Sequence, residues 1–146
     1  MMITQDLIRQ KIVTEIVKQM QQISGANGFY SEAGANVYEW LEKPLDKDEY
    51  PAIIIRDVSD DAQEGQVLSH SLKIEIDIAI KNGAETTWDM REVSSDVLKA
   101  FGNVEESLNY QCAFIGSDFL LEQKDTVYGG VRLEFKVNYQ TRRWEQ

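Results

Sequence analysis

Residues 72–80 constrain the fold of this chain more than any other stretch. They read LKIEIDIAI, with a large apolar residue at every second position and with Lys73, Glu75 and Asp77 between them. A period of two is typical of a β-strand with one buried face and one hydrated face. Burying five such side chains stabilises a fold by roughly 7–15 kcal/mol as an upper bound. The sequence therefore predicts a sheet built around one long strand.

The same patterns predict the other elements. Apolar residues at helical spacing indicate a helix over residues 5–23 and a second that begins at Thr86 or Thr87 and ends at Gly102. Further strands are expected over residues 36–42, 50–55, 112–122, with a bulge near Gly116, and 130–141. The predicted fold is α+β: a single domain over residues 1–146 with a mainly antiparallel sheet of about five strands and two helices packed on one face.

Size and charge limit the class of protein. A chain of 146 residues with 42% apolar residues can bury a core, and no apolar run is long enough to predict a transmembrane helix. The net charge of −10 repels phosphates and argues against a module that reads nucleic acid, although it suits a wall that DNA slides past. The lone Cys112 builds no intrachain disulfide, and we interpret it as a small buried residue rather than a nucleophile.

Several short motifs follow one another in a familiar order. Val37-Tyr38 is followed by Lys43-Pro44-Leu45 and by Tyr50-Pro51-Ala52-Ile53, then by an acidic segment and the long alternating strand. This order, closed by a last strand that ends in Tyr139-x-Thr141, resembles the tail terminator family of long-tailed bacteriophages, which are tail-completion or minor tail proteins.

The resemblance implies a structural virion-assembly protein and no enzyme. It implies a homo-oligomeric ring, hexameric in the family, that sits on the last ring of the tail-tube protein, stops tube polymerisation and offers the surface for head joining. The other partner would be a head–tail connector or neck protein, while DNA passes through without being specifically bound. No catalytic residue, cofactor, metal or membrane is implied, and the location would be the virion tail after synthesis in the bacterial host cytoplasm. A neck or head–tail completion protein of similar size is the alternative.

Two groups of residues are candidate contacts. Residues 56–71 are predicted to be a polar hairpin connection, and its acidic side chains are expected on a ring face or in the ring lumen: Asp57, Asp60, Asp61 and Glu64. A solvated loop and a metal-binding loop are the other interpretations, but the spacing of these acids does not match a calcium loop. Near the end of the chain, an aromatic side chain flanked by arginines is expected either to contact a neighbour or to be a frayed tail: Arg142, Arg143 and Trp144.

The residue patterns that could indicate an enzyme are weaker than those that indicate a structural protein. Glu134-x-Lys136 on a strand, with Asp118 and Asp125 upstream, resembles the carboxylate and lysine arrangement of magnesium-dependent nucleases. The same spacing also describes an exposed charge pair on a hydrated strand face. His70, the one histidine, has no nucleophile elbow to serve. A cytosolic ligand-binding domain is the third possibility.

Overall fold

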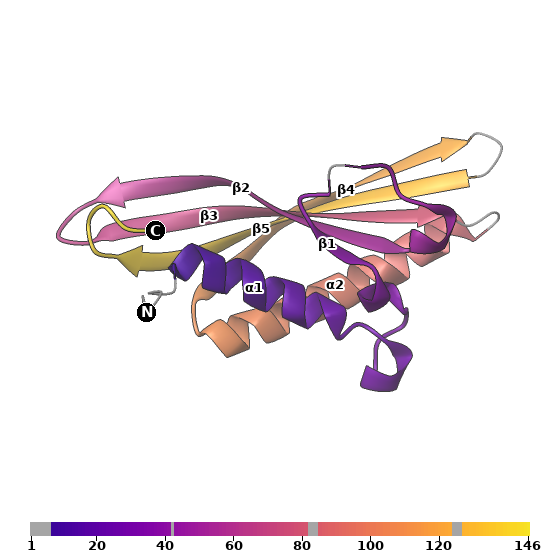
Figure 1. The fold of residues 1–146 in the computed structure, drawn as a ribbon, viewed down its shortest axis with the longest axis horizontal. Helices are drawn as coiled ribbons and strands as arrows, with labels where there is room; N and C mark the ends of the chain where they lie inside the picture. Colours follow the sequence, from indigo (N-terminus) through magenta and orange to yellow (C-terminus); the bar gives the residue numbers. More distant parts are fainter. Residues whose placement is uncertain (1–6, 42, 82–84, 124–126) are drawn as a thin grey trace, which may run out of the picture.

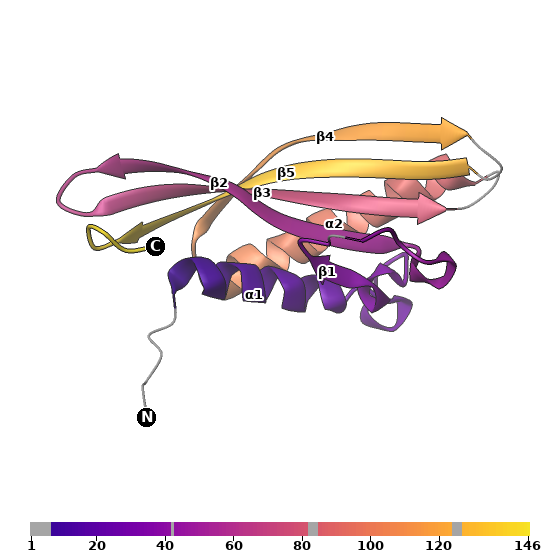
Figure 2. The same ribbon diagram turned by 45° about the horizontal axis from the view of Figure 1, so that its top comes forward.

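The computed structural model describes residues 7–41, 43–81, 85–123 and 127–146 (Figure 1). Its strands form one sheet in the order β1-β2-β3-β5-β4, in which β1 runs parallel to β2 and every other pair is antiparallel. The helices lie on one face of this sheet (Figures 1 and 2). The predicted α+β architecture is therefore confirmed. The elements are α1 Ile8–Gln21, β1 Val37–Glu39, β2 Ala52–Glu64, β3 Leu68–Lys81, α2 Thr86–Leu108, β4 Gln111–Gln123 and β5 Val127–Thr141.

The core lies between the sheet and the helices. The alternating apolar residues predicted in residues 72–80 all point to this side and are at most 3% exposed. Helix α1 contributes Ile12 and Ile16, and helix α2 contributes Phe101, whose ring stacks on Phe135 of β5 at 3.9 Å between centroids. Strand β2 is covered on both faces at Ile54 and its neighbours, as its continuous apolar run predicts.

The expectation of a polar connection over residues 56–71 is wrong. Strands β2 and β3 continue as a paired hairpin as far as Glu64 and Leu68, with a bulge between Asp57 and Ser59. Antiparallel pairing satisfies the backbone hydrogen bonds of this stretch whatever its side chains are. His70, which falls within the predicted connection, therefore lies inside β3 and is 4% exposed.

Two other predicted boundaries also differ. Helix α2 does not end at Gly102 but continues to Leu108, where Asn109 adopts a left-handed conformation with φ of 58°. Fully buried Val104 extends the apolar stripe past the glycine, so packing outweighs the low helix propensity of one residue. Strand β1 is shorter than predicted and stops before Trp40, whose φ is 52°. Residues 5, 6 and 42 of the predicted elements lie outside the described residues.

Among the described residues, neither helix combines the length and the apolar character needed to cross a lipid bilayer.

Candidate functional site

Asp57 lies between the sheet and helix α1. Arg9 Nε donates a hydrogen bond to Asp57 Oδ2 at 2.7 Å, and Trp40 Nε1 donates one to Oδ1 at 2.8 Å. Burial alone would raise the pKa of Asp57, but the hydrogen bonds from Trp40 and Arg9 outweigh burial and lower the pKa below its ordinary value. The carboxylate of Asp57 is therefore engaged in joining α1 and the end of β1 to the sheet.

Asp60, His70 and Thr141 form a chain of hydrogen bonds across three strands. His70 Nδ1 lies 2.6 Å from Asp60 Oδ2, and His70 Nε2 lies 2.7 Å from Thr141 Oγ1. The Thr141 hydroxyl also lies 2.9 Å from the carbonyl oxygen of Arg142 and 3.1 Å from that of Glu145. These contacts tie the C-terminal residues to the β2–β3 hairpin, and we call the three side chains the C-terminal clamp.

The clamp has the order carboxylate, imidazole and hydroxyl that hydrolase triads use. In a triad the hydroxyl faces the substrate, whereas Thr141 is 6% exposed and the one proton of its hydroxyl is directed to the backbone, with two carbonyl oxygens within hydrogen-bond distance. The arrangement therefore fits a structural role. Sequence reasoning missed it because His70 and Thr141 are 71 positions apart, and only the pairing of β3 with β5 brings them together.

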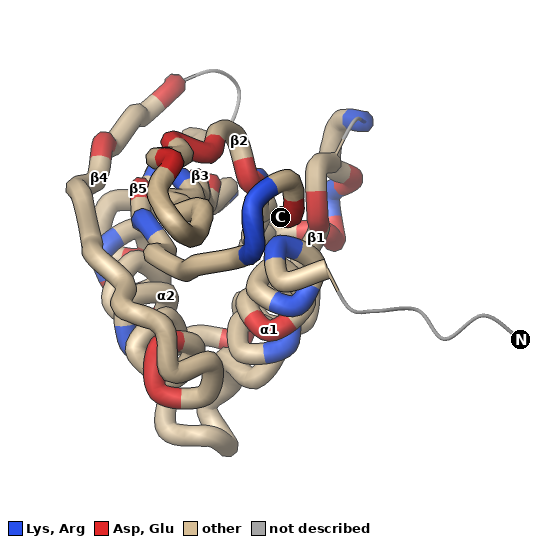
Figure 3. The backbone as a smooth tube through the Cα atoms, turned by 90° about the vertical axis from the view of Figure 1, so that its left-hand side faces the viewer, with Lys and Arg blue, Asp and Glu red and all other residues tan. Residues whose placement is uncertain are grey.

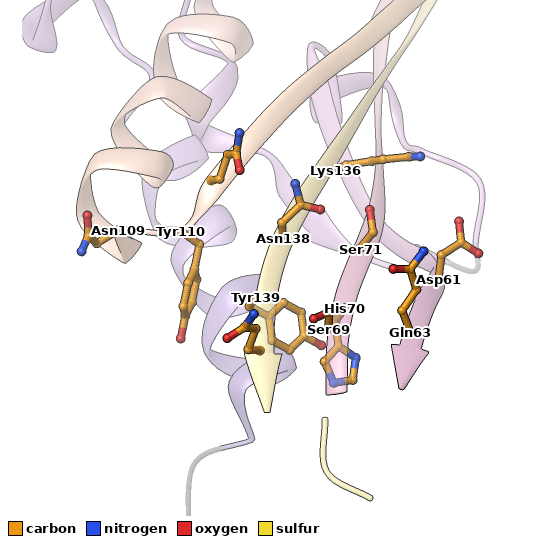
Figure 4. Close-up of a pocket in the computed structure, with 12 residues that line it drawn as sticks. Asp61, Gln63, Ser69, His70, Ser71, Asn109, Tyr110, Lys136, Asn138 and Tyr139 are labelled. Atoms are coloured by element: carbon orange, nitrogen blue, oxygen red, sulfur yellow. The ribbon is translucent and has the colours of Figure 1, made fainter. Parts of the chain in front are cut away.

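Tyr139 packs beside the clamp. Its ring is stacked on the His70 imidazole at 4.5 Å, and both side chains line a polar hollow at this end of the sheet (Figure 4). Burial, followed by the nearby Asp60 carboxylate, raises the pKa of Tyr139 to about 12. Within the described residues, the Tyr139 hydroxyl and Asp60 Oδ1 are buried without a hydrogen-bond partner. Such groups are commonly satisfied by an ordered water.

One residue of each predicted contact group meets the other at the tip of the hairpin. Arg143 Nη2 lies 3.6 Å from Glu64 Oε1, and the Arg143 guanidinium lies over the Trp144 ring at 5.6 Å. Figure 3 views this end of the molecule and shows basic positions on the C-terminal segment and on α1 close to acidic positions of the hairpin. Trp144 is 83% exposed, and the backbone N–H of Ile8 donates to the Gln146 carbonyl at 3.2 Å. The segment is thus fastened at several points, while the Trp144 ring projects into solvent.

The predicted acidic side chains do not share one surface. Asp57 and Asp60 are turned toward the protein interior by the contacts above, whereas Asp61 and Glu64 are exposed. Asp61 pairs in register with Ser71 on the sheet face that points away from the helices. Of the four acids, only Asp61 and Glu64 are exposed to solvent.

The nuclease candidates lie on that outer sheet face. Lys73 Nζ lies 3.7 Å from Glu134 Oε2, and Asp118 of β4 lies opposite Arg132 of β5. Lys73 and Glu134 belong to a series of ion pairs on this face that also includes Arg56, Glu75, Asp77 and Arg132. Asp125 lies outside the described residues. Across the described ranges, no group of three or more histidine, cysteine, aspartate and glutamate side chains could hold a metal ion.

Cys112 is half-buried at the start of β4 and packs against the core. Burial, followed by the Glu105 carboxylate, raises the pKa of its thiol to about 11. The reactive thiolate is therefore scarce at neutral pH, in agreement with the interpretation of Cys112 as a packing residue.

Several exposed apolar side chains gather on β4, which sequence reasoning predicts as a strand but not as a contact. In the described residues, β4 pairs only with β5 and forms an edge of the sheet (Figure 2). Its large apolar side chains are between 40% and 65% exposed. We call them the edge patch: Phe114, Ile115, Phe119, Leu120 and Leu121. The sequence did contain a signal for this patch: residues 114–121 read FIGSDFLL, and apolar residues on both faces of a strand leave some of them outside the core.

Comparison with protein-family models gave no match, and comparison with curated proteins gave none.

Proposed function

We propose that this protein is a virion-assembly protein of a tailed bacteriophage or prophage. It assembles as a ring, hexameric by analogy with the family it resembles, on the last ring of tail-tube subunits. There it ends tube polymerisation and provides the surface to which the head joins. It acts in the virion tail after synthesis in the host cytoplasm, and its work is binding rather than bond making.

The observation that carries the proposal is the edge patch on β4. Native sheets usually protect their edges with lysine, proline or a cover, because an open edge pairs with other chains. Strand β4 has a bulge and the charges of Asp118 and Glu122 but neither lysine nor proline, and it still exposes large apolar side chains along an unpaired edge of the described sheet. Such a strand is suited to adding a neighbour's strand or surface.

Termination needs only geometry. A ring closes when each subunit contacts the next through two different surfaces, and a tube stops growing when the outer face of the ring cannot accept another subunit. The exposed acids Asp61 and Glu64, together with the net charge of −10, support a surface past which DNA can move without being held.

Electron microscopy of particles from which this gene has been deleted tests the proposal. The expected result is abnormally long, headless tails that the gene supplied in trans restores to normal length. Tails of normal length that fail to join heads would instead identify a neck protein. Normal-length tails joined to heads would overturn both assignments.

A point variant tests whether the edge patch, and not just the presence of the protein, is needed to restore tail length. Phe119→Asp places a carboxylate in the edge patch, and in trans it should fail to restore tail length. The matched control Trp88→Asp alters an exposed aromatic of α2 instead. It should complement normally.

A further inference from the structure

We infer that the free protein pairs with a second copy of itself through β4, strand against antiparallel strand, about a two-fold axis perpendicular to the sheet. This inference concerns the free protein and rests on the edge patch and its register alone. Because the proposed ring contact uses the same patch, the two-fold pair separates before a ring forms.

The first step is the size of the exposed surface. Side chains such as those of the edge patch carry on the order of 150–200 Å² each, so about half exposure leaves roughly 400 Å² of apolar surface on each copy. The largest apolar patch of a typical soluble monomer is about 300–600 Å² and is often a functional contact, so this surface has the size of such a contact. Two such strands, with their backbone edges and the flanking α2 side chains, reach the roughly 1,000 Å² that a specific interface needs.

The second step is which side chains share a face. The pairing with β5 places Ser117, Phe119 and Leu121 on the helix side of the sheet. Gly116, Asp118, Leu120 and Glu122 point to the other side. The bulge between Phe114 and Gly116 shifts this alternation, so a regular two-stranded ladder that keeps both faces consistent is confined to residues 116–122.

Charge then selects one register. Centring the axis on Asp118 would place this aspartate opposite its copy, and centring it on Leu120 would place Asp118 opposite Glu122. Like charges directly opposite each other destabilise a strand pair. Centring on Phe119 avoids both clashes, because Asp118 then faces Leu120 and Glu122 faces Gly116. It also pairs every residue of the 116–122 ladder and sets Phe119 against Phe119 of the second copy.

The helices leave room for this interface. Helix α2 packs over β5 through the stacked rings of Phe101 and Phe135. With neighbouring strands about 4.8 Å apart, β5, β4 and their copies would hold the two α2 helices roughly 14 Å apart. Helices in direct contact are about 8–10 Å apart, so large side chains must fill the intervening space. Phe119, Leu121, Phe114 and half-exposed Leu98 of both copies line it.

Light scattering coupled to size exclusion, over a protein concentration series, tests the pairing with the full chain. A dimer is expected, and Phe119→Asp should weaken its association at least tenfold. Trp88→Asp, the matched control on the exposed surface of α2, should leave it unchanged. Circular dichroism checks that both variants are folded. A protein that stays monomeric at every concentration, or a dimer that Phe119→Asp does not weaken, overturns the inference.

A cross-link tests the register without disturbing the patch by charge. In a Cys112→Ser background, Phe119→Cys should form an intermolecular disulfide on mild oxidation, since directly paired residues have Cβ atoms about 5 Å apart. Trp144→Cys in the same background is the control and should not cross-link efficiently. Larger oligomers in which the Phe119→Cys variant does not cross-link would show that β4 pairs with a different edge, and would overturn the two-fold arrangement.

The result of this test does not depend on the deletion experiment. A dimer of the free protein would be compatible with any tail phenotype, so either experiment can fail while the other succeeds.

Discussion

At the scale of single residues, the carboxylates of the hairpin illustrate how position changes role. Asp57 and Asp61 are four positions apart on β2, yet Asp57 receives hydrogen bonds from α1 and from Trp40 while Asp61 is exposed. The difference arises because the bulge after Asp57 and the strand alternation turn the two side chains toward different faces.

Asp57→Asn should lower the free energy of unfolding by about 1–2 kcal/mol at neutral pH, because it removes a charge-assisted hydrogen bond. The folded protein holds the pKa of Asp57 below its ordinary value of 3.8. Its contribution is therefore present above about pH 4 and is lost as the pH falls through the depressed pKa. Urea unfolding of both proteins at neutral pH and at decreasing pH should show the difference shrinking. Asp61→Asn, the exposed control, should change stability little at either pH, and a pH-independent loss for Asp57→Asn would contradict the assignment.

Thr141→Val should release the C-terminal segment. The substitution keeps the shape of the side chain but removes the hydroxyl that His70 Nε2 contacts and that donates its proton to a backbone carbonyl, at a cost of about 1–3 kcal/mol. Trypsin cleavage after Arg142 and Arg143 should become several-fold faster. Ser69→Val, which changes a polar side chain of the neighbouring strand β3 outside the clamp, is the control. Unchanged cleavage in Thr141→Val would show that the clamp does not hold this segment.

At the scale of elements, two glycines have opposite surroundings. A Cβ at Gly102 in α2 would meet no atom within 4 Å. A Cβ at Gly129 in β5 would lie 2.7 Å from Met90 Sδ and 2.8 Å from Thr86 Cγ2. The first glycine is thus a weak point of a helix, and the second is required for helix α2 to pack on the sheet.

Gly102→Ala should stabilise the protein by about 0.5–1 kcal/mol, because alanine loses less backbone entropy in a helix. Gly129→Ala should destabilise it by about 1–3 kcal/mol through overpacking. Thermal unfolding of the two variants beside the wild type measures both signs in one experiment. Destabilisation by Gly102→Ala would indicate that α2 does not continue past this residue.

At the scale of the whole molecule, charge opposes assembly. A chain with net charge −10 repels its own copies, and this repulsion extends over a Debye length that shortens as salt is added. Any association through the edge patch is apolar at its centre, so added salt weakens the repulsion without weakening the contact.

Self-association should therefore strengthen several-fold between low and physiological ionic strength. Sedimentation or light scattering at the two ionic strengths measures the change, with sodium chloride as the added salt. If association weakens with salt instead, ion pairs rather than the edge patch hold the copies together.

Local patterns along the chain were enough to predict the element types and most of the core. Strict alternation in residues 72–80, the apolar run around Ile54 and the helical spacing in α1 each report which face is buried, and burial of apolar surface is the dominant local signal. The bulge near Gly116 was predicted from the interruption of an apolar strand by glycine and is confirmed.

The positions of the polar contacts, in contrast, depend on the pairing of strands. The pairing of β2 with β3 made strands of a stretch whose side chains indicate a loop, and the pairing of β3 with β5 joined His70 to Thr141. The strand order places β4 at the edge of the described sheet, and its apolar side chains are therefore available for contact with another molecule. These outcomes depend on contacts between residues far apart in the chain, which local periodicity does not encode.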